Sequence, residues 1–475
     1  MPSIRRTAAV LAAVLVTAGI AVAAPAQASP PKPPKPDAPD KVVSAYFTDW
    51  SVYGRGYFVK DIPADKLNVI QYAFGDAVYD PATGNVGCNV LDPWADYQQV
   101  YWGGENSVDG QPDDFGANGN LYGNFNQLKK LKAAHPHLKV EISLGGWTKS
   151  KWFSTLASTA ELRQKFAAAC IDTFIKGNLP TGGWPEDAGG LGVAAGIFDG
   201  IDLDWEYPTA VADGNYNVSP ADRRNATLLA AEFRKQLDAY GATTGKHYLL
   251  TAALPAATSS TRYYELKAFV KHLDWANIMT YDFNVASSPV VAHNTLFTRD
   301  PKDPNAKNHT WNTVGTVAYY LANGVPANKI VVGVPFYGQQ YLRTGSKNNG
   351  LYTPFDNTGL DPNQLVADVA VQPSFHALVE AGYVSEDGRT GGNGYQVGWN
   401  KLAGEPYLYS AAASHPNLTT GPETVRTFIA YSSPASIGER TALIEKLGLR
   451  GAMAWELSQD SDSGALISAL APILE

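Results

Sequence analysis

The sequence predicts an α/β fold in which eight parallel strands, alternating with helices, close into a (β/α)8 TIM barrel. Eight short apolar runs recur along the chain, rich in Val, Ile and aromatic residues, and several are apolar nearly throughout. Such runs are typical of parallel strands buried on both faces. A doubly wound open sheet would use the same elements, so the count favours the barrel without deciding it. The runs span 42–47, 69–74, 139–144, 200–205, 248–253, 276–281, 330–335 and 451–455.

Helical patterns separate these runs, and two of the connections are unusually long. The helices are expected at 123–134, 159–176, 221–240 and 434–447. The interval between the runs that end at 335 and begin at 451 far exceeds one loop and one helix. We expect an α+β insertion domain over 341–425, which leaves 41–340 and 426–475 for the barrel. A second insertion, 76–122, also follows a strand's carboxyl end, where barrel active sites lie, so both insertions should deepen a cleft.

The first residues have the pattern of an export signal. Arg5 and Arg6 precede an Ala/Val/Leu run, and Ala26-Gln27-Ala28 offers the small residues of a cleavage site. The run is too short and too Ala-rich for a typical membrane span. We therefore expect a signal peptide at 1–28, a Pro-rich extended linker at 29–40, and a secreted, extracellular protein without a membrane partner.

Composition narrows the class of function. A net charge of −8 argues against a nucleic-acid binder. The chain carries 11 Trp, 25 Tyr and 17 Phe, more than a core needs, and aromatic ring faces match the apolar faces of sugars. No Cys/His spacing resembles a metal site, so we expect no metal and no cofactor. Cys88 and Cys170 fit either a disulfide, which export permits, or a buried free thiol. A monomer is the default expectation.

Acidic residues alternate along one predicted strand. The segment 198–208 reads FDGIDLDWEYP. Residues two apart share a face of a strand and lie roughly 6.6–6.8 Å apart, which places Asp202, Asp204 and Glu206 on one side. Burying three acids inside a barrel is costly, and the apolar residues around them argue against a solvated edge strand. The stretch therefore indicates a catalytic function.

The proximity of these acids predicts different roles for them. Like charges in a poorly solvated site cannot all ionise, so at least one pKa must rise. Glu206 is the longest and lies nearest the strand's carboxyl end, which favours it as a general acid with a raised pKa. Asp204 is placed to share a proton with Asp202 or with Glu206. Asp199 is out of phase and is expected to fix backbone or a loop.

The motif DGIDLDWEYP resembles that of glycoside hydrolase family 18, the chitinases, whose four acids have the spacing of Asp199, Asp202, Asp204 and Glu206. The resemblance covers about residues 41–475. It is to the bacterial members of the family, which have an insertion domain before the eighth barrel strand. The matching strand ends are Tyr46-Phe47, Phe74, Ser143-Leu-Gly-Gly-Trp147, Met279-Thr-Tyr-Asp282, Gly333-Val-Pro-Phe-Tyr-Gly338 and Met453-Ala-Trp-Glu456.

This resemblance implies hydrolysis of β-1,4 bonds in chitin with retention and without a protein nucleophile. The substrate's own acetamido oxygen would attack the anomeric carbon while Glu206 protonates the leaving oxygen. Asp204, with Asp202 as its alternate partner, would hold the acetamido N–H. Tyr46 and Ser143 would bond to that carboxylate pair, Tyr281 would steady the acetamido group and Asp282 the sugar hydroxyls. Trp455 would form the floor, with Trp147, Phe74 and Met279 as further lining.

Each of these roles has a simpler structural reading. Tyr46, Phe74, Met279 and Trp455 would also suit packing, Asp282 a turn, and Gly145-Gly146 the close approach of a helix. Two positions depart from the family: Gln339 replaces a frequent Arg, and Ser432-Ser433 replace frequent acidic residues.

Three other functions remain open. One is a non-catalytic chitin-binding lectin on the same barrel. A second is an endo-β-N-acetylglucosaminidase that cuts N-glycans. The third is an unrelated retaining glycosidase, which would need a carboxylate about 5–5.5 Å from the acid; Asp282 is the nominee.

Overall fold

The computed structural model describes residues 38–115, 119–212, 214–304 and 310–475. The expected signal peptide and residues 29–37 of the expected linker lie outside these ranges. Within them, no helix combines the length and apolar character needed to cross a membrane.

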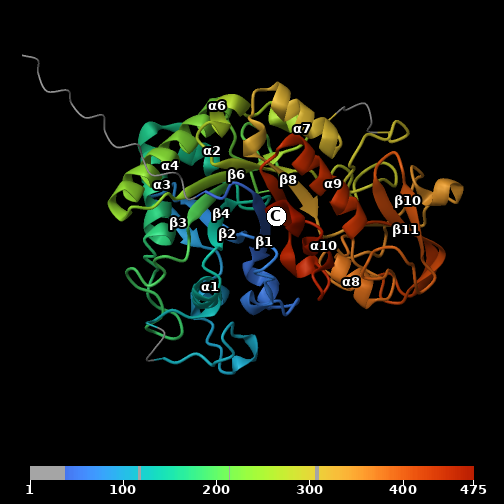
Figure 1. Cartoon of the computed structure of the whole chain (residues 1–475), viewed down its shortest axis with the longest axis horizontal. Helices are drawn as coiled ribbons and strands as arrows, with labels where there is room; N and C mark the ends of the chain where they lie inside the picture. The colour runs from blue at the N-terminus through green and yellow to red at the C-terminus, as the bar shows by residue number, and fades with distance from the viewer. Residues whose placement is uncertain (1–37, 116–118, 213, 305–309) are drawn as a thin grey trace, which may run out of the picture. The chain divides into compact units, whose positions relative to one another are not determined.

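Eight parallel strands form a closed barrel, which confirms the predicted fold class. Around the barrel the order is β1, β13, β8, β7, β6, β5, β4 and β2, and pairing of β1 with β2 closes the circle. The strands lie at the centre of the view in Figure 1. Their bounds are β1 Val42–Thr48, β2 Val69–Tyr79, β4 Lys139–Gly145, β5 Gly200–Asp204, β6 Leu249–Pro255, β7 Trp275–Met279, β8 Ile330–Pro335 and β13 Gly451–Trp455.

Helices surround the strands (Figure 1). The longest, α4, is capped at its C-terminus by Gly245, whose φ of 72° lies in the left-handed region that glycine tolerates. Helix α9 begins at Pro434, after Ser433, whose side chain accepts a hydrogen bond from the Ser436 N–H. The bounds are α1 Gly123–Ala134, α2 Phe153–Ser158, α3 Ala160–Cys170, α4 Asp222–Thr244, α5 Thr258–Thr261, α6 Leu266–Val270, α7 Thr313–Ala322, α8 Phe375–Glu380, α9 Pro434–Leu447 and α10 Ala465–Ser468.

Alternate side chains of the strands belong to two different clusters, one between the strands and the helices and one inside the barrel. On β1, Val43, Ala45 and Phe47 join the large core between strands and helices, whereas Val42 and Tyr46 belong to a second cluster inside the barrel. Polar side chains occupy the inside as well. Strand register places Ser143 of β4, Asp202 of β5 and Thr251 of β6 opposite one another. The barrel therefore encloses a level of polar residues around Asp202.

A four-stranded antiparallel sheet lies between β8 and β13 in the chain. Its order is β10, β11, β12 and β9, and it includes the segment expected as an insertion. The sheet begins at Gln339 and ends at Ala430, slightly outside 341–425, because β9 and β12 pair with each other over these end residues. The bounds are β9 Gln339–Leu342, β10 Gln396–Asn400, β11 Glu405–His415 and β12 Glu423–Ala430.

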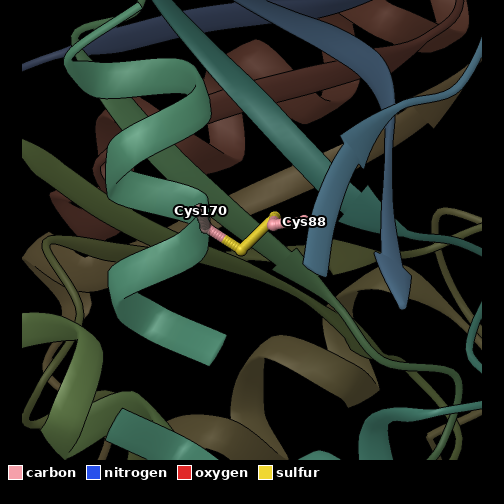
Figure 2. The surroundings of a disulfide bond; sticks show 2 residues. All are labelled: Cys88 and Cys170. Atoms are coloured by element: carbon pink, nitrogen blue, oxygen red, sulfur yellow. A yellow bond between two sulfur atoms is a disulfide. The ribbon is translucent and has the colours of Figure 1, made fainter. Parts of the chain in front are cut away.

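A disulfide ties the other insertion to the helix layer. Strand β2 continues past the barrel to Tyr79 and turns through Gly84 into β3, Val86–Val90, which pairs with it antiparallel. Cys88 of β3 is bonded to Cys170 at the end of α3 (Figure 2). The free-thiol alternative is therefore wrong. The expected helix 159–176 also changes type here, since a π-helical turn, Ile171–Ile175, follows α3.

Candidate active site

The carboxylate of Asp202 lies at the centre of the barrel and is fully buried. One oxygen, Oδ2, accepts hydrogen bonds from the hydroxyls of Tyr46 (3.1 Å) and Ser143 (2.8 Å). The other, Oδ1, accepts from the Thr251 hydroxyl (2.6 Å) and the Asn277 amide (3.2 Å). Four donors around one carboxylate favour its charged form, although burial raises the pKa of Asp202 above its ordinary value.

Asp204 and Glu206 continue outward from Asp202, and these three residues are called the acid file below. The exposed fractions of the three residues rise in that order, from 0% through 4% to 8%, so Glu206 is the one nearest the open end. Among the described residues, Oδ1 of Asp204 is buried without a hydrogen-bond partner. An unpaired buried oxygen is costly, and it leaves Asp204 able to accept a proton or a donor from a ligand.

Backbone contacts fix the end of β5. The hydroxyl of Ser150 accepts a hydrogen bond from the Glu206 N–H at 2.9 Å and lies within donating distance of the Asp204 carbonyl, at 3.2 Å. Gly145 adopts φ +106°, and a Cβ there would lie 2.4 Å from the Asp204 carbonyl oxygen. The glycine therefore permits close approach of β5 and also of helix α2, whose Phe153 ring would lie 2.8 Å from such a Cβ.

The three acids differ in their electrostatics. Burial raises the pKa of Glu206 to about 7, and the negative charge of Asp282 adds to this effect. Burial first, and then the charges of Glu206 and Asp202, hold the pKa of Asp204 well above its usual range. A pKa of about 7 lets Glu206 keep its proton near neutral pH, so it is poised as a proton donor.

Aromatic rings line the hollow above these acids. Trp455 packs at 4.9 Å from Tyr46 and stacks at 5.8 Å on Phe74, measured between ring centroids. Trp50, which sequence reasoning missed, lies 6.1 Å from Phe74 and remains 43% exposed. Trp147 is half exposed. These rings provide flat apolar faces of the kind that sugars contact.

Asp282 and Tyr281 approach Glu206 from the end of β7. Asp282 adopts φ +53°, so it also serves as a turn residue, and burial raises its pKa. The Tyr337 hydroxyl donates a 2.7 Å hydrogen bond to Oδ1 of Asp282. Tyr281 contacts the Met453 sulfur at 3.8 Å, and the pKa of its phenol lies well above its usual value because of burial and the nearby acids.

Three connected hollows form a groove across the carboxyl ends of the strands. One of about 290 Å³ is lined by Asp204, Glu206, Tyr46 and Trp455. It shares Glu206 with a second, of about 700 Å³, which extends along Tyr207 and Trp311. It shares Trp50 with a third, of about 130 Å³. Glu206 therefore lines both of the larger hollows, which adjoin at this residue.

The structure brings the expected site residues together. Those lining the groove are Tyr46, Phe74, Trp147, Asp204, Glu206, Met279, Tyr281, Asp282 and Trp455. Asp202 and Ser143 lie beneath it and bond to each other. Asp199 lies apart, as expected: its carboxylate binds Lys132 Nζ at 2.6 Å and the Val140 N–H at 2.9 Å.

The two departures from the family pattern lie away from the groove lining. Gln339 is fully buried, and its carboxamide has no partner among the described residues. Ser433 caps α9. Neither Gln339 nor Ser433 lines the hollows around Glu206.

Several residues of the site were not found from the sequence. Thr251 and Asn277 hold Asp202, and Ser150 holds Glu206. Tyr337, which the sequence offered only as part of the 333–338 motif, holds Asp282. Glu141 is also buried inside the barrel, 3.1 Å from the Thr251 hydroxyl. Alternation along each strand was the only available signal, since it indicates which residues point inward but not what they meet. Within the described ranges, no cluster of His, Cys, Asp or Glu has the arrangement of a metal site.

A barrel in which the acid file leads into a groove lined by aromatic rings has the arrangement of a glycoside hydrolase. The model of the family "Glycosyl hydrolases family 18" matches residues 42–460. The chain therefore belongs to glycosyl hydrolase family 18.

Individual relatives agree with this assignment. The chain is 36% identical over 472 residues to "Chitinase A1" of Niallia circulans, covering 93% of this chain and 59% of the relative. It is 32% identical over 429 residues to "Endochitinase 1" of Metarhizium robertsii, covering 88% and 81%. The solved catalytic domain of psychrophilic chitinase B from Arthrobacter TAD20 superposes with a TM-score of 0.78 at 33% identity, covering 92% of this chain and 96% of that one. The chain thus spans less than two thirds of the first relative's length.

Proposed function

We propose that the protein is a secreted chitinase, which hydrolyses β-1,4 bonds between N-acetylglucosamine units with retention, and that Glu206 is its general acid and base. The observation that carries the proposal is the position of Glu206. Its carboxyl group lies at the outer end of the acid file, with a pKa raised to about 7, and it lines both large hollows. A sugar bond crossing from one hollow to the other would pass this carboxyl group.

In the first step the Glu206 carboxyl gives its proton to the glycosidic oxygen. The bond from the anomeric carbon to that oxygen breaks, and the leaving oxygen keeps the electron pair. The acetamido carbonyl oxygen of the same sugar forms a new bond to the anomeric carbon, which gives a cyclic oxazolinium ion. In the second step water attacks that carbon, Glu206 takes the water's proton, and the ring opens. Two inversions at one carbon amount to retention.

Asp204 fits the role of stabilising the positive intermediate. The acetamido N–H would donate to its unpaired, buried Oδ1. The carboxylate of Asp202, held by its four donors, lies next along the file and supplies negative charge without leaving its place. Donors and charges that are in place before reaction need no reorganisation during it.

The names of the relatives support chitin as the substrate, since those reported above are called chitinases. Two adjoining hollows that share Glu206 support a substrate of several linked sugars, because one hollow can hold the sugars before the cut bond and the other those after it. Export of the enzyme, which the Arg5-Arg6 start and the apolar run after it support, would place it where insoluble chitin lies. We propose a monomer that needs no cofactor.

Two alternative activities lead to different measurable results. An endo-β-N-acetylglucosaminidase would release N-glycans from glycoproteins and leave chitin oligosaccharides uncut. A chitin-binding lectin would bind the oligosaccharides without cutting them. The intact acid file argues against a lectin, because a protein that only binds has no need of a proton donor.

The first test follows the new reducing end of a chitin hexasaccharide by time-resolved proton NMR. Fresh β-anomer is expected, and fresh α-anomer would overturn acetamido participation. Glu206→Gln should lower kcat on the order of 10³-fold while oligosaccharide binding, measured by calorimetry, persists. The matched control is Glu439→Gln, at an exposed position on α9. Near-normal turnover in Glu206→Gln would exclude Glu206 as the acid.

A further inference from the structure

Gln372, in the long connection between β8 and β13, lies where the three hollows meet. It lines the 290 Å³ hollow, the 700 Å³ hollow and the 130 Å³ hollow. The two larger hollows share only six lining residues, and five of these were expected from the sequence: Trp147, Glu206, Met279, Tyr281 and Asp282. The sixth is Gln372. Glu206 is in that shared set, so the set surrounds the place where the bond is cut.

The backbone around Gln372 is held firmly. The Val371 carbonyl accepts a 3.0 Å hydrogen bond from the Gln340 N–H, and the Pro373 carbonyl accepts a 2.8 Å bond from the Gly338 N–H. A further bond of 2.9 Å runs from the Phe375 N–H to the Phe336 carbonyl. The segment therefore runs alongside the residues that follow β8.

The side chain of Gln372 is exposed, whereas those of Pro373, Ser374 and Phe375 are buried. Within the described part of the chain, its carboxamide makes no hydrogen bond. A fixed backbone with a free polar end is suited to binding a ligand, because little backbone freedom is lost when contact is made.

The chemistry of a carboxamide matches that of an N-acetylglucosamine chain. The Gln372 oxygen accepts and its NH₂ donates, while sugar hydroxyls do both and the acetamido group offers one N–H and one carbonyl. Most other polar groups in the shared set are acids or phenols. Beside the Trp147 indole N–H, which only donates, Gln372 adds a neutral group with both an N–H donor and a carbonyl acceptor.

We propose that Gln372 binds the sugars on the two sides of the scissile bond and so acts as a substrate-binding residue at the point of cleavage. The inference rests on the proposed chitinase activity and extends it to a residue of the segment between β8 and β13. The proposal predicts an effect that is the same for every bond of the chain that is cut. Whichever bond of a chain is cut, the two sugars beside that bond occupy this place. Gln372 therefore contributes equally to every binding register.

The test compares Gln372→Ala and Gln372→Leu with the wild-type enzyme on a chitin hexasaccharide. Both variants should lower kcat/KM by about three- to tenfold, the value of one or two neutral hydrogen bonds, and the ratio of dimer to trimer products should stay unchanged. Gln364→Ala is the matched control, because Gln364 is an exposed glutamine of the same connection that lines none of these hollows. It should behave as wild type.

Trp50→Ala provides a contrast, because Trp50 lines the 290 Å³ and 130 Å³ hollows but not the 700 Å³ hollow. It should change the product ratio. The inference is overturned if Gln372→Leu retains the wild-type kcat/KM, or if the Gln372 variants change only the product ratio. Failure of the wild-type enzyme to cut the hexasaccharide would instead overturn the proposed chitinase activity. Thermal unfolding of each variant verifies that it is folded.

Discussion

The hydroxyl of Tyr337 donates a 2.7 Å hydrogen bond to Asp282, and the charge of Asp282 in turn raises the pKa of Glu206. Tyr337 follows β8 and Asp282 follows β7, so residues at the ends of two strands together influence the pKa of Glu206, which follows β5. The proton affinity of Glu206 thus depends on residues far from it in the chain.

Replacing Asp282 with Asn should shift the alkaline limb of the pH profile of kcat/KM to lower pH. Without the neighbouring negative charge, Glu206 loses its proton more readily, so the acid form is depleted sooner as pH rises. The shift should be roughly half a pH unit, read from profiles normalised to their maxima. Tyr337→Phe is the control: it keeps the carboxyl group and should shift the limb less. Superimposable profiles for Asp282→Asn and wild type would contradict the coupling.

Glu206 should destabilise the fold as pH rises. Its pKa is raised from 4.5 to about 7 in the folded state, so the folded protein holds this proton more tightly than the unfolded chain. The free energy of unfolding therefore falls between about pH 4.5 and 7 on account of this group. Glu206→Gln removes the effect, and its stability advantage over wild type should grow by on the order of 1–3 kcal/mol from pH 4 to pH 8.

Urea unfolding midpoints at a series of pH values would measure that advantage. Glu439→Gln should show no comparable growth. An advantage for Glu206→Gln that is equal at both ends of the range would mean that Glu206 titrates normally.

A buried ion pair connects the antiparallel sheet to the barrel's helix layer. Arg440 of α9 donates to Glu405 of β11 at 2.5 Å, and both side chains are 1% exposed. Glu405→Leu alone should cost about 3–5 kcal/mol, because it leaves a buried guanidinium without its partner. The double variant Glu405→Leu/Arg440→Met should be more stable than that single variant. Additive losses in a denaturant double-mutant cycle would show that the two residues are not coupled.

The fold was predictable from the sequence because its strands are buried on both faces. The apolar runs that end at 335 and 455 coincide with the ends of β8 and β13. Strand β2 was underestimated, since its second half leaves the barrel to pair with β3 and carries a mixed polar pattern. Local apolar character indicates a barrel strand and gives little information about a hairpin beyond it.

The acid file was predictable for a different reason. Asp202 and Asp204 belong to β5, and Glu206 lies two residues beyond its end, so alternation, which is a local property, indicated all three. The partners of Asp202 come from other strands, and the register between strands has no local signal. Gln372 is harder still, since it lies in an irregular segment whose position depends on pairing with residues after β8. The cysteines remained undecided because their 82-residue separation carries no distance information.

The Cys88–Cys170 bond closes a covalent ring that contains α1 and β4. The exposed stretch 109–112 lies within this ring. A single backbone cut in that stretch would not divide the molecule. The two pieces would remain one covalent body, with β4 still held between β2 and β5, so the disulfide gives this part of the chain tolerance to a nick.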